Sequence, residues 1–363
     1  MSQTGMNFTV PSSLSGGEQG RVFYLDFLRV FATLAVILLH LTVDTLKFAS
    51  VHSISWNAMN IINSATRWAA PVFFMISGTL FLNREYTLKN LYLKKIGRIV
   101  TCFIFWSALY AGWNYWQGTS LKETVATFLR GPEHFWFLFA IVGMYVFLPL
   151  LKKIVQSKTL TEYFLIITFS SSVIIGGIVP VVGLFSDGIA DIVYDWMRYS
   201  NMICAVTYAS YFVLGDYLHR TELSKNQTKV IYAAGIAGFV MSVGLTVLFS
   251  WHYGELKEQF YSYFSANVVM MTPAVFVFAK NLYAGGKIPL KLQVFFQKVS
   301  KYCFGVFLIH MLLLHIAYDL FGNVIRSTSA VITFPLLFIA VTLVSFIVSV
   351  VLNKLPFLKK YIV

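Results

Sequence analysis

Ten long apolar stretches, separated by short polar segments, dominate the hydropathy pattern of this chain. Each is long enough to cross the hydrocarbon core of a bilayer as an α-helix, which takes about 20 residues. The pattern predicts an all-α integral membrane protein, built as a bundle of about ten transmembrane helices. The expected spans are 23–46, 57–82, 97–117, 134–152, 162–183, 199–218, 229–250, 261–280, 302–321 and 329–353.

The polar segments predict the domain organisation and the topology. Residues 1–20 are polar and rich in Ser and Gly, which predicts a disordered N-terminal tail. Residues 21–363 show no internal repeat and no long linker, so we expect a single transmembrane domain. With the N-terminus inside, 20 of the 28 Lys and Arg residues fall on the inner side and 6 on the outer side. Because cytoplasmic segments are enriched in Lys and Arg, we expect a multi-pass protein of the inner or plasma membrane with both termini cytoplasmic.

Composition and charge narrow the partners. The chain is 58% hydrophobic and 12% charged, whereas an ordinary soluble domain is about 25% charged. The net charge of +13 is explained by lysines in the cytoplasmic loops, so we expect membrane lipids and no nucleic acid as partners. The three cysteines lie in separate apolar stretches and fit no zinc spacing. No metal site is predicted.

The first span carries ionisable residues on one face. Arg29 and His40 are eleven residues apart, which is three helical turns plus about 20°, so both point the same way. Asp26 falls near the same stripe and can pair with Arg29. Ionisable groups inside a bilayer cost about 2.5–3.5 kcal/mol each on insertion scales and are functional candidates. His40 is the predicted base or acyl carrier, although a snorkelling arginine and a hydrogen-bonded core histidine are the simpler alternative.

Two further groups of residues can bind a substrate from the inner side. Arg67 lies near the middle of the second span, where it needs a carboxylate, backbone carbonyls or a substrate. Ser77 and Gly78, near the inner end of that span, leave room for another helix or a ligand. The cluster formed by Lys94, Lys95 and Arg98 can bind the phosphates of a cofactor, or can contact lipid headgroups.

Candidate residues for the outer side lie at the start of the fourth span and in the ninth. Glu133 and Trp136 open the fourth span, and can assist acid–base chemistry and stack on a sugar; the tryptophan can equally be part of an interfacial aromatic belt. His310 is the deeper of two histidines in the ninth span. His315 lies five residues further on, so the two point in different directions and a shared metal site is not expected.

Taken in order, these segments resemble the membrane-bound acyltransferase family 3. The resemblance starts with Leu25–Arg29 followed by His40, which is similar to the family's arginine–ten residues–histidine motif. It continues through Phe73–Gly78, Trp136–Leu138, Tyr145–Leu150 and Phe307–His310. An inner-face Arg-x-x-Arg motif is represented by Lys95 and Arg98, which keeps the charge but loses one planar guanidinium. Asn63–Gly78 and the two late histidines resemble most the branch that O-acetylates enterobacterial common antigen.

The resemblance implies acyl transfer, usually of acetyl, from cytoplasmic acyl-CoA to a hydroxyl of a cell-surface or lipid-linked glycan. It implies acetyl-CoA as the donor substrate, bound near Arg98, Lys95, Lys94 and Ser77. His40, Arg29 and Asp26 would carry the catalysis, and Glu133, Trp136, Arg67 and His310 would bind the acceptor. The competing interpretation is a polytopic transporter or flippase for a glycan or lipid, which the absence of visible repeats and of paired broken helices disfavours.

Overall fold

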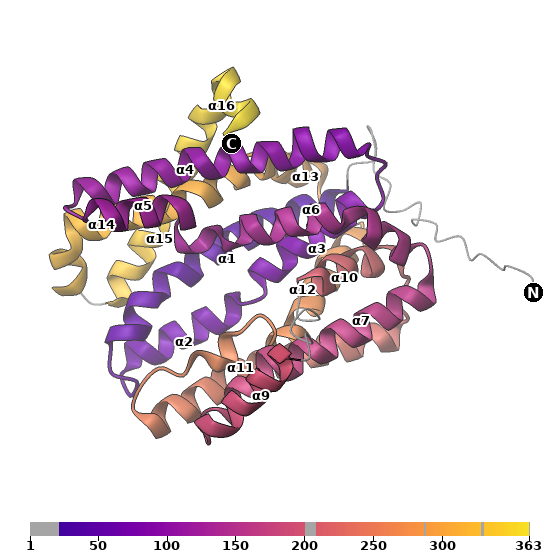
Figure 1. The fold of residues 1–363 in the computed structure, drawn as a ribbon, viewed down its shortest axis with the longest axis horizontal. Helices are drawn as coiled ribbons and strands as arrows, with labels where there is room; N and C mark the ends of the chain where they lie inside the picture. Colours follow the sequence, from indigo (N-terminus) through magenta and orange to yellow (C-terminus); the bar gives the residue numbers. More distant parts are fainter. Residues whose placement is uncertain (1–21, 200–207, 287, 328–329, 363) are drawn as a thin grey trace, which may run out of the picture. The chain divides into compact units, whose positions relative to one another are not determined.

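The computed structural model describes residues 22–199, 208–286, 288–327 and 330–362, in which every regular element is a helix (Figure 1). Nine helical segments in these residues are long and apolar enough to cross a membrane, so the prediction of an all-α membrane bundle is confirmed. The predicted sixth span lies partly outside the described residues, and its described part forms the 12-residue helix α10. The nine segments are Phe23–Phe48, Ile54–Leu82, Asn90–Trp116, Leu121–Val155, Lys158–Val182, Lys225–Tyr253, Glu258–Ala284, Leu290–Asn323 and Ile332–Lys354.

The helices form two compact units, which share helix α1 (Phe23–Phe48). The first unit contains most of α1, and residues 42–83 and 151–300. Its other helices are α2 (Ile54–Thr66), α3 (Ala69–Leu82), α7 (Lys158–Val173), η4 (Ile174–Ile178), α8 (Val179–Val182), α9 (Asp187–Tyr199), α10 (Ala209–Arg220), α11 (Lys225–Tyr253), η6 (Glu258–Tyr261), α12 (Ala266–Ala284) and α13 (Leu290–Val299).

The first unit depends on close helix–helix packing at glycines. A β-carbon on Gly78 of α3 would overlap the backbone carbonyl of Phe212 in α10, and one on Gly215 of α10 would overlap the backbone of Met75. Small residues of this kind let transmembrane helices approach backbone to backbone. The sequence predicted that the Ser77–Gly78 surface admits another helix or a ligand, and at Gly78 the partner is helix α10.

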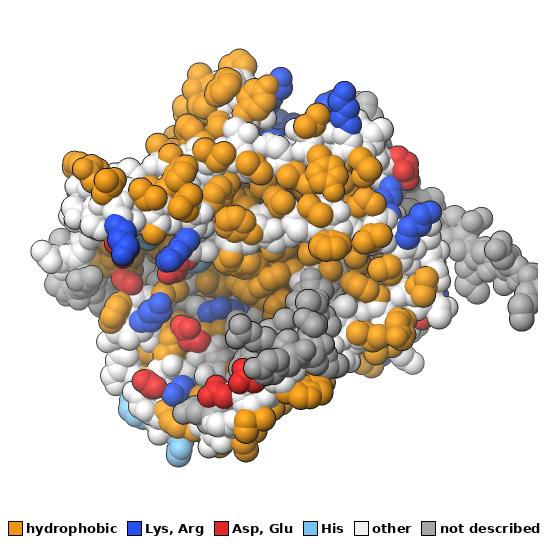
Figure 2. Space-filling view, viewed as in Figure 1, with side chains coloured by type: hydrophobic (Ala, Val, Ile, Leu, Met, Phe, Trp, Pro, Cys, Tyr) orange, Lys and Arg blue, Asp and Glu red, His pale blue; other side chains and the backbone are white. Residues whose placement is uncertain are grey.

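The second unit comprises residues 36–41 of α1 together with 84–150 and 301–363. Its aromatic core includes Trp106, Tyr110 and Phe135, packed against Leu308. Hydrophobic side chains of α4 are exposed over much of its visible face, as expected for a helix in contact with lipid (Figure 2). The helices are η2 (Asn90–Ile96), α4 (Gly97–Trp116), α5 (Leu121–Arg130), η3 (Glu133–Phe135), α6 (Trp136–Val155), η7 (Ser300–Tyr302), α14 (Cys303–Ser327), α15 (Ala330–Lys354) and α16 (Pro356–Tyr361).

Three local features differ from the sequence prediction. The second span is not continuous, because α2 ends at Thr66 and α3 begins at Ala69, with a turn between them. The segments predicted as outer loops contain the helices α5 and α9, and an inner loop contains α13. These helices have 10 to 13 residues, too few to register as spans. Lys94 and Lys95 lie in the π-helical segment η2 that leads into α4.

Candidate active site

Three histidines from distant parts of the sequence meet in the second unit. His40 lies on α1, His134 in the short 3₁₀ helix η3, and His310 on α14. The ring centroids of His40 and His310 are 5.3 Å apart, those of His134 and His310 5.1 Å, and those of His40 and His134 6.3 Å. His134 and His310 are buried, at 4% and 1% exposure. We refer to these three residues as the histidine cluster.

The hydrogen bonds of His310 fix where its proton is. Its Nδ1 lies 2.8 Å from the carbonyl oxygen of Phe307 and 3.2 Å from that of Val306. A carbonyl only accepts, so Nδ1 carries the hydrogen and donates it. In the neutral ring, Nε2 is then left with a lone pair. This atom is buried and has no hydrogen-bond partner among the residues the structure describes, which makes it an available base inside the cluster.

His134 is the member of the cluster that the sequence analysis did not select. One ring nitrogen makes a weak hydrogen bond to the backbone carbonyl of Leu308, and within the described part of the chain neither ring nitrogen forms a hydrogen bond of good geometry. A buried polar group without such a partner costs about 1–3 kcal/mol. The available signal in the sequence was the position of His134 between Glu133 and Trp136, at the start of an apolar span.

The side chain of Tyr110 links α4 to α14, the helix that contains His310. Its hydroxyl donates to the carbonyl of Leu308 at 3.0 Å and accepts from the backbone N–H of Leu312 at 2.9 Å. These two backbone groups lie one helical turn apart on α14, so the hydroxyl contacts the turn that contains His310. The Tyr110 ring also lies 5.6 Å from that of His134 and 6.4 Å from that of His315. Tyr110 therefore helps to position His134 and His310.

Glu133 and Trp136, predicted to bind the acceptor, flank the cluster. Glu133 is exposed and lines a cavity that His134 also lines. Trp136 begins α6 and is half-buried, with its ring centroid 6.1 Å from that of Phe137. The structure thus places Glu133, but not Trp136, on the wall of this cavity.

Asp26 and Arg29 form an ion pair in the first unit. The guanidinium of Arg29 lies 3.2 Å from the carboxylate of Asp26, which also accepts a 2.6 Å hydrogen bond from the Ser300 hydroxyl. The Asp26 side chain is 5% exposed and that of Arg29 28%. Asp26 is therefore held by Ser300, while part of the Arg29 guanidinium remains open for another anionic or carbonyl group.

Arg67 finds its partners within the first unit. It is the C-cap residue of α2, in the turn that interrupts the second span. Its Nε donates to the side chain of Asn63 at 2.6 Å, an Nη donates to the carbonyl of Tyr261 at 3.3 Å, and the guanidinium lies 4.2 Å from the centre of the Tyr261 ring. Carbonyl and amide oxygens thus satisfy the charge, and these contacts need no ligand.

The three basic residues predicted to bind the acyl donor are close in sequence and exposed. Lys94 and Lys95 lie in η2, and Arg98 in the first turn of α4, three residues after Lys95. Residues three apart on a helix lie on one side of it, so Lys95 and Arg98 can act on the same anion. Ser77 belongs to the other unit, where it is half-buried on α3.

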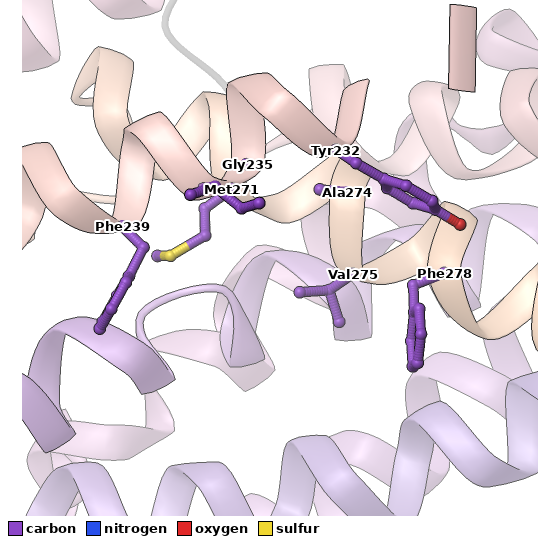
Figure 3. A pocket seen from close by; sticks show the side chains of 8 residues that line it. Tyr232, Gly235, Phe239, Met271, Ala274, Val275 and Phe278 are labelled. Atoms are coloured by element: carbon purple, nitrogen blue, oxygen red, sulfur yellow. The ribbon is translucent and has the colours of Figure 1, made fainter. Parts of the chain in front are cut away.

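A second concave surface in the first unit has a different character. It is a groove of about 320 Å³ between α11 and α12, lined by Phe239, Met271, Val275 and Phe278 among others (Figure 3). Apart from the phenol of Tyr232, its lining side chains are hydrocarbon or thioether, so the groove offers no general base. The groups capable of acid–base chemistry are those of the histidine cluster.

Comparison with known proteins decides the family. The family model described as an acyltransferase domain, that of acyltransferase family 3, matches residues 22–354. The chain belongs to acyltransferase family 3. The match covers the whole histidine cluster and both helical units except α16 and the chain ends, so it supports membrane acyltransferase activity and does not favour a transporter. No curated protein and no solved structure in the comparisons matches the chain. Membership in the enterobacterial common antigen branch stays a prediction.

Proposed function

We propose that this acyltransferase moves an acetyl group from cytoplasmic acetyl-CoA to a hydroxyl of a cell-surface or lipid-linked glycan. Family membership supports the acyl transfer itself. The finer assignment is supported by the resemblance of the sequence motifs and by the chemistry of the histidine cluster. The loop charges favour a protein of the inner or plasma membrane, with both termini in the cytoplasm.

The observation that carries the proposal is the free lone pair on Nε2 of His310, next to His40 and His134. Acetyl transfer needs a base that removes the proton from the acceptor hydroxyl as the oxygen attacks the thioester carbonyl. The new carbon–oxygen bond forms, the carbon–sulfur bond breaks, and the coenzyme A thiolate takes the proton from the imidazolium. A neutral imidazole shielded from water suits this task at neutral pH.

His40 and Arg29 lie on the same helix, α1. In the proposed acyl transfer, Arg29 is on the donor side and His40 on the acceptor side. Eleven residues of α-helix separate the two by about 16 Å along the axis, roughly half the hydrocarbon thickness. Arg29 would support the thioester end of the donor, and Lys95 and Arg98 would bind its phosphates. His40 then either accepts the acetyl group and passes it to the acceptor hydroxyl that His310 deprotonates, or takes that proton in place of His310.

The decisive experiment follows labelled acetyl-CoA with the purified full-length protein in nanodiscs and a glycan extract as acceptor. We expect label in the glycan with the native protein, and its loss in His40→Ala at equal protein level and equal melting temperature. His52→Ala is the matched control, because His52 is an exposed histidine outside the cluster, and it should keep full activity. Undiminished transfer by His40→Ala would overturn the mechanism.

A further inference from the structure

A polar cavity of about 400 Å³ opens beside the histidine cluster, within the second unit. Its wall comes from α4, α5, the 131–134 segment and α14. The side chains that give it its character are Tyr110, Glu123, Arg130, Glu133, His134 and His315. Small-molecule sites usually have volumes of roughly 300–1,000 Å³. The size of this cavity suits about one or two sugar rings and excludes a long oligosaccharide.

His134 belongs both to this cavity and to the histidine cluster. Its ring is 4% exposed, and its nitrogens lack a well-formed hydrogen bond within the described residues. A hydroxyl bound at the inner end of the cavity can supply the missing partner. That hydroxyl would then lie next to His310, whose ring centroid is 5.1 Å from that of His134.

Helix α5 forms one wall of the cavity and has two distinct faces. Glu123, Ala126 and Thr127 line the cavity, whereas Leu121, Val125 and Leu129 are 68%, 49% and 66% exposed. At 100° per residue, the centres of these two sets lie about 150° apart around the helix. A short helix with charged residues on one face and an exposed apolar stripe on the other lies at a membrane surface. The cavity therefore opens at the level of the lipid headgroups.

The charges in the cavity discriminate between possible ligands. Two carboxylates, Glu123 and Glu133, face one guanidinium, Arg130. Neither carboxylate forms a salt bridge within the described part of the chain. Carboxylates accept hydrogen bonds from hydroxyl and amide groups and repel anions. An uncharged sugar is thus favoured over one that carries a carboxylate.

We propose that this cavity is the acceptor site, and that it binds an uncharged sugar unit at the membrane surface with one hydroxyl directed to His134. The role as acceptor site rests on the function proposed above, whereas sugar binding can be tested without it. The sugar can arrive on a lipid or as a soluble glycan, and the two sources differ in whether an alkyl anchor strengthens binding.

The test measures binding of sugars to the full-length protein in nanodiscs, without acyl-CoA, by saturation-transfer NMR. The probes are the octyl and methyl β-glycosides of glucose, galactose and N-acetylglucosamine, and methyl β-glucuronide as the anion. We expect at least one uncharged glycoside to bind at least tenfold more tightly than the glucuronide. Octyl glycosides also partition into lipid, so their binding to empty nanodiscs is subtracted. Tighter remaining binding of octyl than of methyl glycosides then indicates a lipid-linked source, and equal binding indicates a soluble one. Failure of all three sugars to bind, or equal binding of the glucuronide, would overturn the proposal.

Substitutions at two adjacent residues of α5 test whether the glycosides bind in this cavity. Ala126→Trp fills the cavity and should weaken glycoside binding at least tenfold, whereas Val125→Trp, on the opposite face, should leave it unchanged. Glu133→Gln, at an exposed position, should narrow the preference for the glucoside over the glucuronide. Equal binding by native protein and Ala126→Trp, or an unchanged preference in Glu133→Gln, would place the sugar elsewhere.

Acetyl transfer separates this proposal from the proposed function. If glycosides bind in a manner that depends on Ala126 but no acetyl-CoA is consumed, the acetyltransferase assignment fails and the sugar site stands. If transfer occurs and Ala126→Trp keeps the native KM for the acceptor, the site proposal fails and the assignment stands.

Discussion

Two sets of buried ionisable groups differ in how fully they are hydrogen-bonded: Asp216 and Lys280 in the first unit, and His134 and His310 in the second. In the first unit, the Asp216 carboxylate pairs with Arg220 and accepts a 2.5 Å hydrogen bond from Asn83, and Lys280 donates to three backbone carbonyls at 2.7–3.0 Å. In the second unit, His134 and His310 keep ring nitrogens without a well-formed hydrogen bond among the described residues. Buried groups that are hydrogen-bonded stabilise the packing of helices. Buried groups without hydrogen bonds lower the free energy of unfolding, and such groups are typical of functional sites. The comparison assigns structure to the first set and chemistry to the second.

The strongest test of this contrast is His310→Gln. The variant removes the imidazole lone pair but keeps a polar side chain, so kcat should fall about 10²–10⁴-fold, the usual contribution of a general base. The melting temperature should fall only modestly, because loss of the Nδ1 hydrogen bond to the backbone carbonyls costs about 1 kcal/mol, whereas Nε2 has no hydrogen-bond partner in the described residues. Steady-state acetyl transfer and a thermal melt in the same nanodiscs measure both quantities. A loss of less than threefold in kcat would remove His310 from the chemistry.

The converse test is Asp216→Ala in the first unit. It leaves the Arg220 guanidinium, which is 12% exposed, without its carboxylate, and breaking a buried pair in this way costs about 3–5 kcal/mol. Folded stability should fall sharply, while kcat per folded molecule stays near native. Glu162→Ala is the control, because Glu162 is 43% exposed and pairs with the exposed Lys158, a contact worth about 0–1 kcal/mol. Equal stability of the two variants would contradict the structural role of Asp216.

Tyr110→Phe tests the link between α4 and the His310 helix. Without the hydroxyl, α4 loses its hydrogen bonds to the backbone of Leu308 and Leu312, so stability should drop by about 1–3 kcal/mol. The turn that carries His310 should shift, and a misplacement of about 1 Å costs up to about 100-fold in rate. We expect kcat to fall tenfold or more with an unchanged KM for acetyl-CoA. A native kcat would show that the hydroxyl does not position the cluster.

The smallest effect is expected at the exposed basic residues. Lys95→Ala and Arg98→Ala should each raise the KM for acetyl-CoA about two- to fivefold, as for exposed charge pairs, and leave kcat unchanged. Lys122→Ala on α5, on the outer side in the predicted topology, is the control and should have no effect. Unchanged KM values in both variants would show that Lys95 and Arg98 do not bind acetyl-CoA and contribute only to the positive charge of the predicted cytoplasmic side.

Features that depend on local sequence were predictable from it. The hydropathy pattern predicted α1 within two residues of its observed bounds, because a membrane span depends on a continuous run of apolar residues. The spacing of Arg29 and His40 was likewise readable, since helical periodicity relates residues on one helix. The break at Arg67 and Trp68 has a local signal in Pro71, which cannot donate to the Arg67 carbonyl and clashes with it. The contacts with Tyr261 that stabilise the turn are tertiary and could not be read from the sequence.

Only part of the candidate site could be predicted from the sequence, because the site depends on contacts between different helices. His40 and His310 were selected as buried ionisable residues, each on its own span. Their meeting with His134 joins positions more than 90 residues apart in sequence, and hydropathy carries no information on which helices pack together. The polar cavity was missed because α5 has only 10 residues, too few to cross a membrane, and its segment was treated as a loop.

Helix α5 also has a consequence for how acceptor preference can diverge within a family. None of its residues is buried, so substitutions there remove no core packing and should be nearly neutral for folding. Four positions on one face line the cavity, while the histidine cluster is built from other helices. If the cavity is the acceptor site proposed above, substitutions on this exposed face can change the sugar preference while the histidine cluster, and with it the reaction, stays the same.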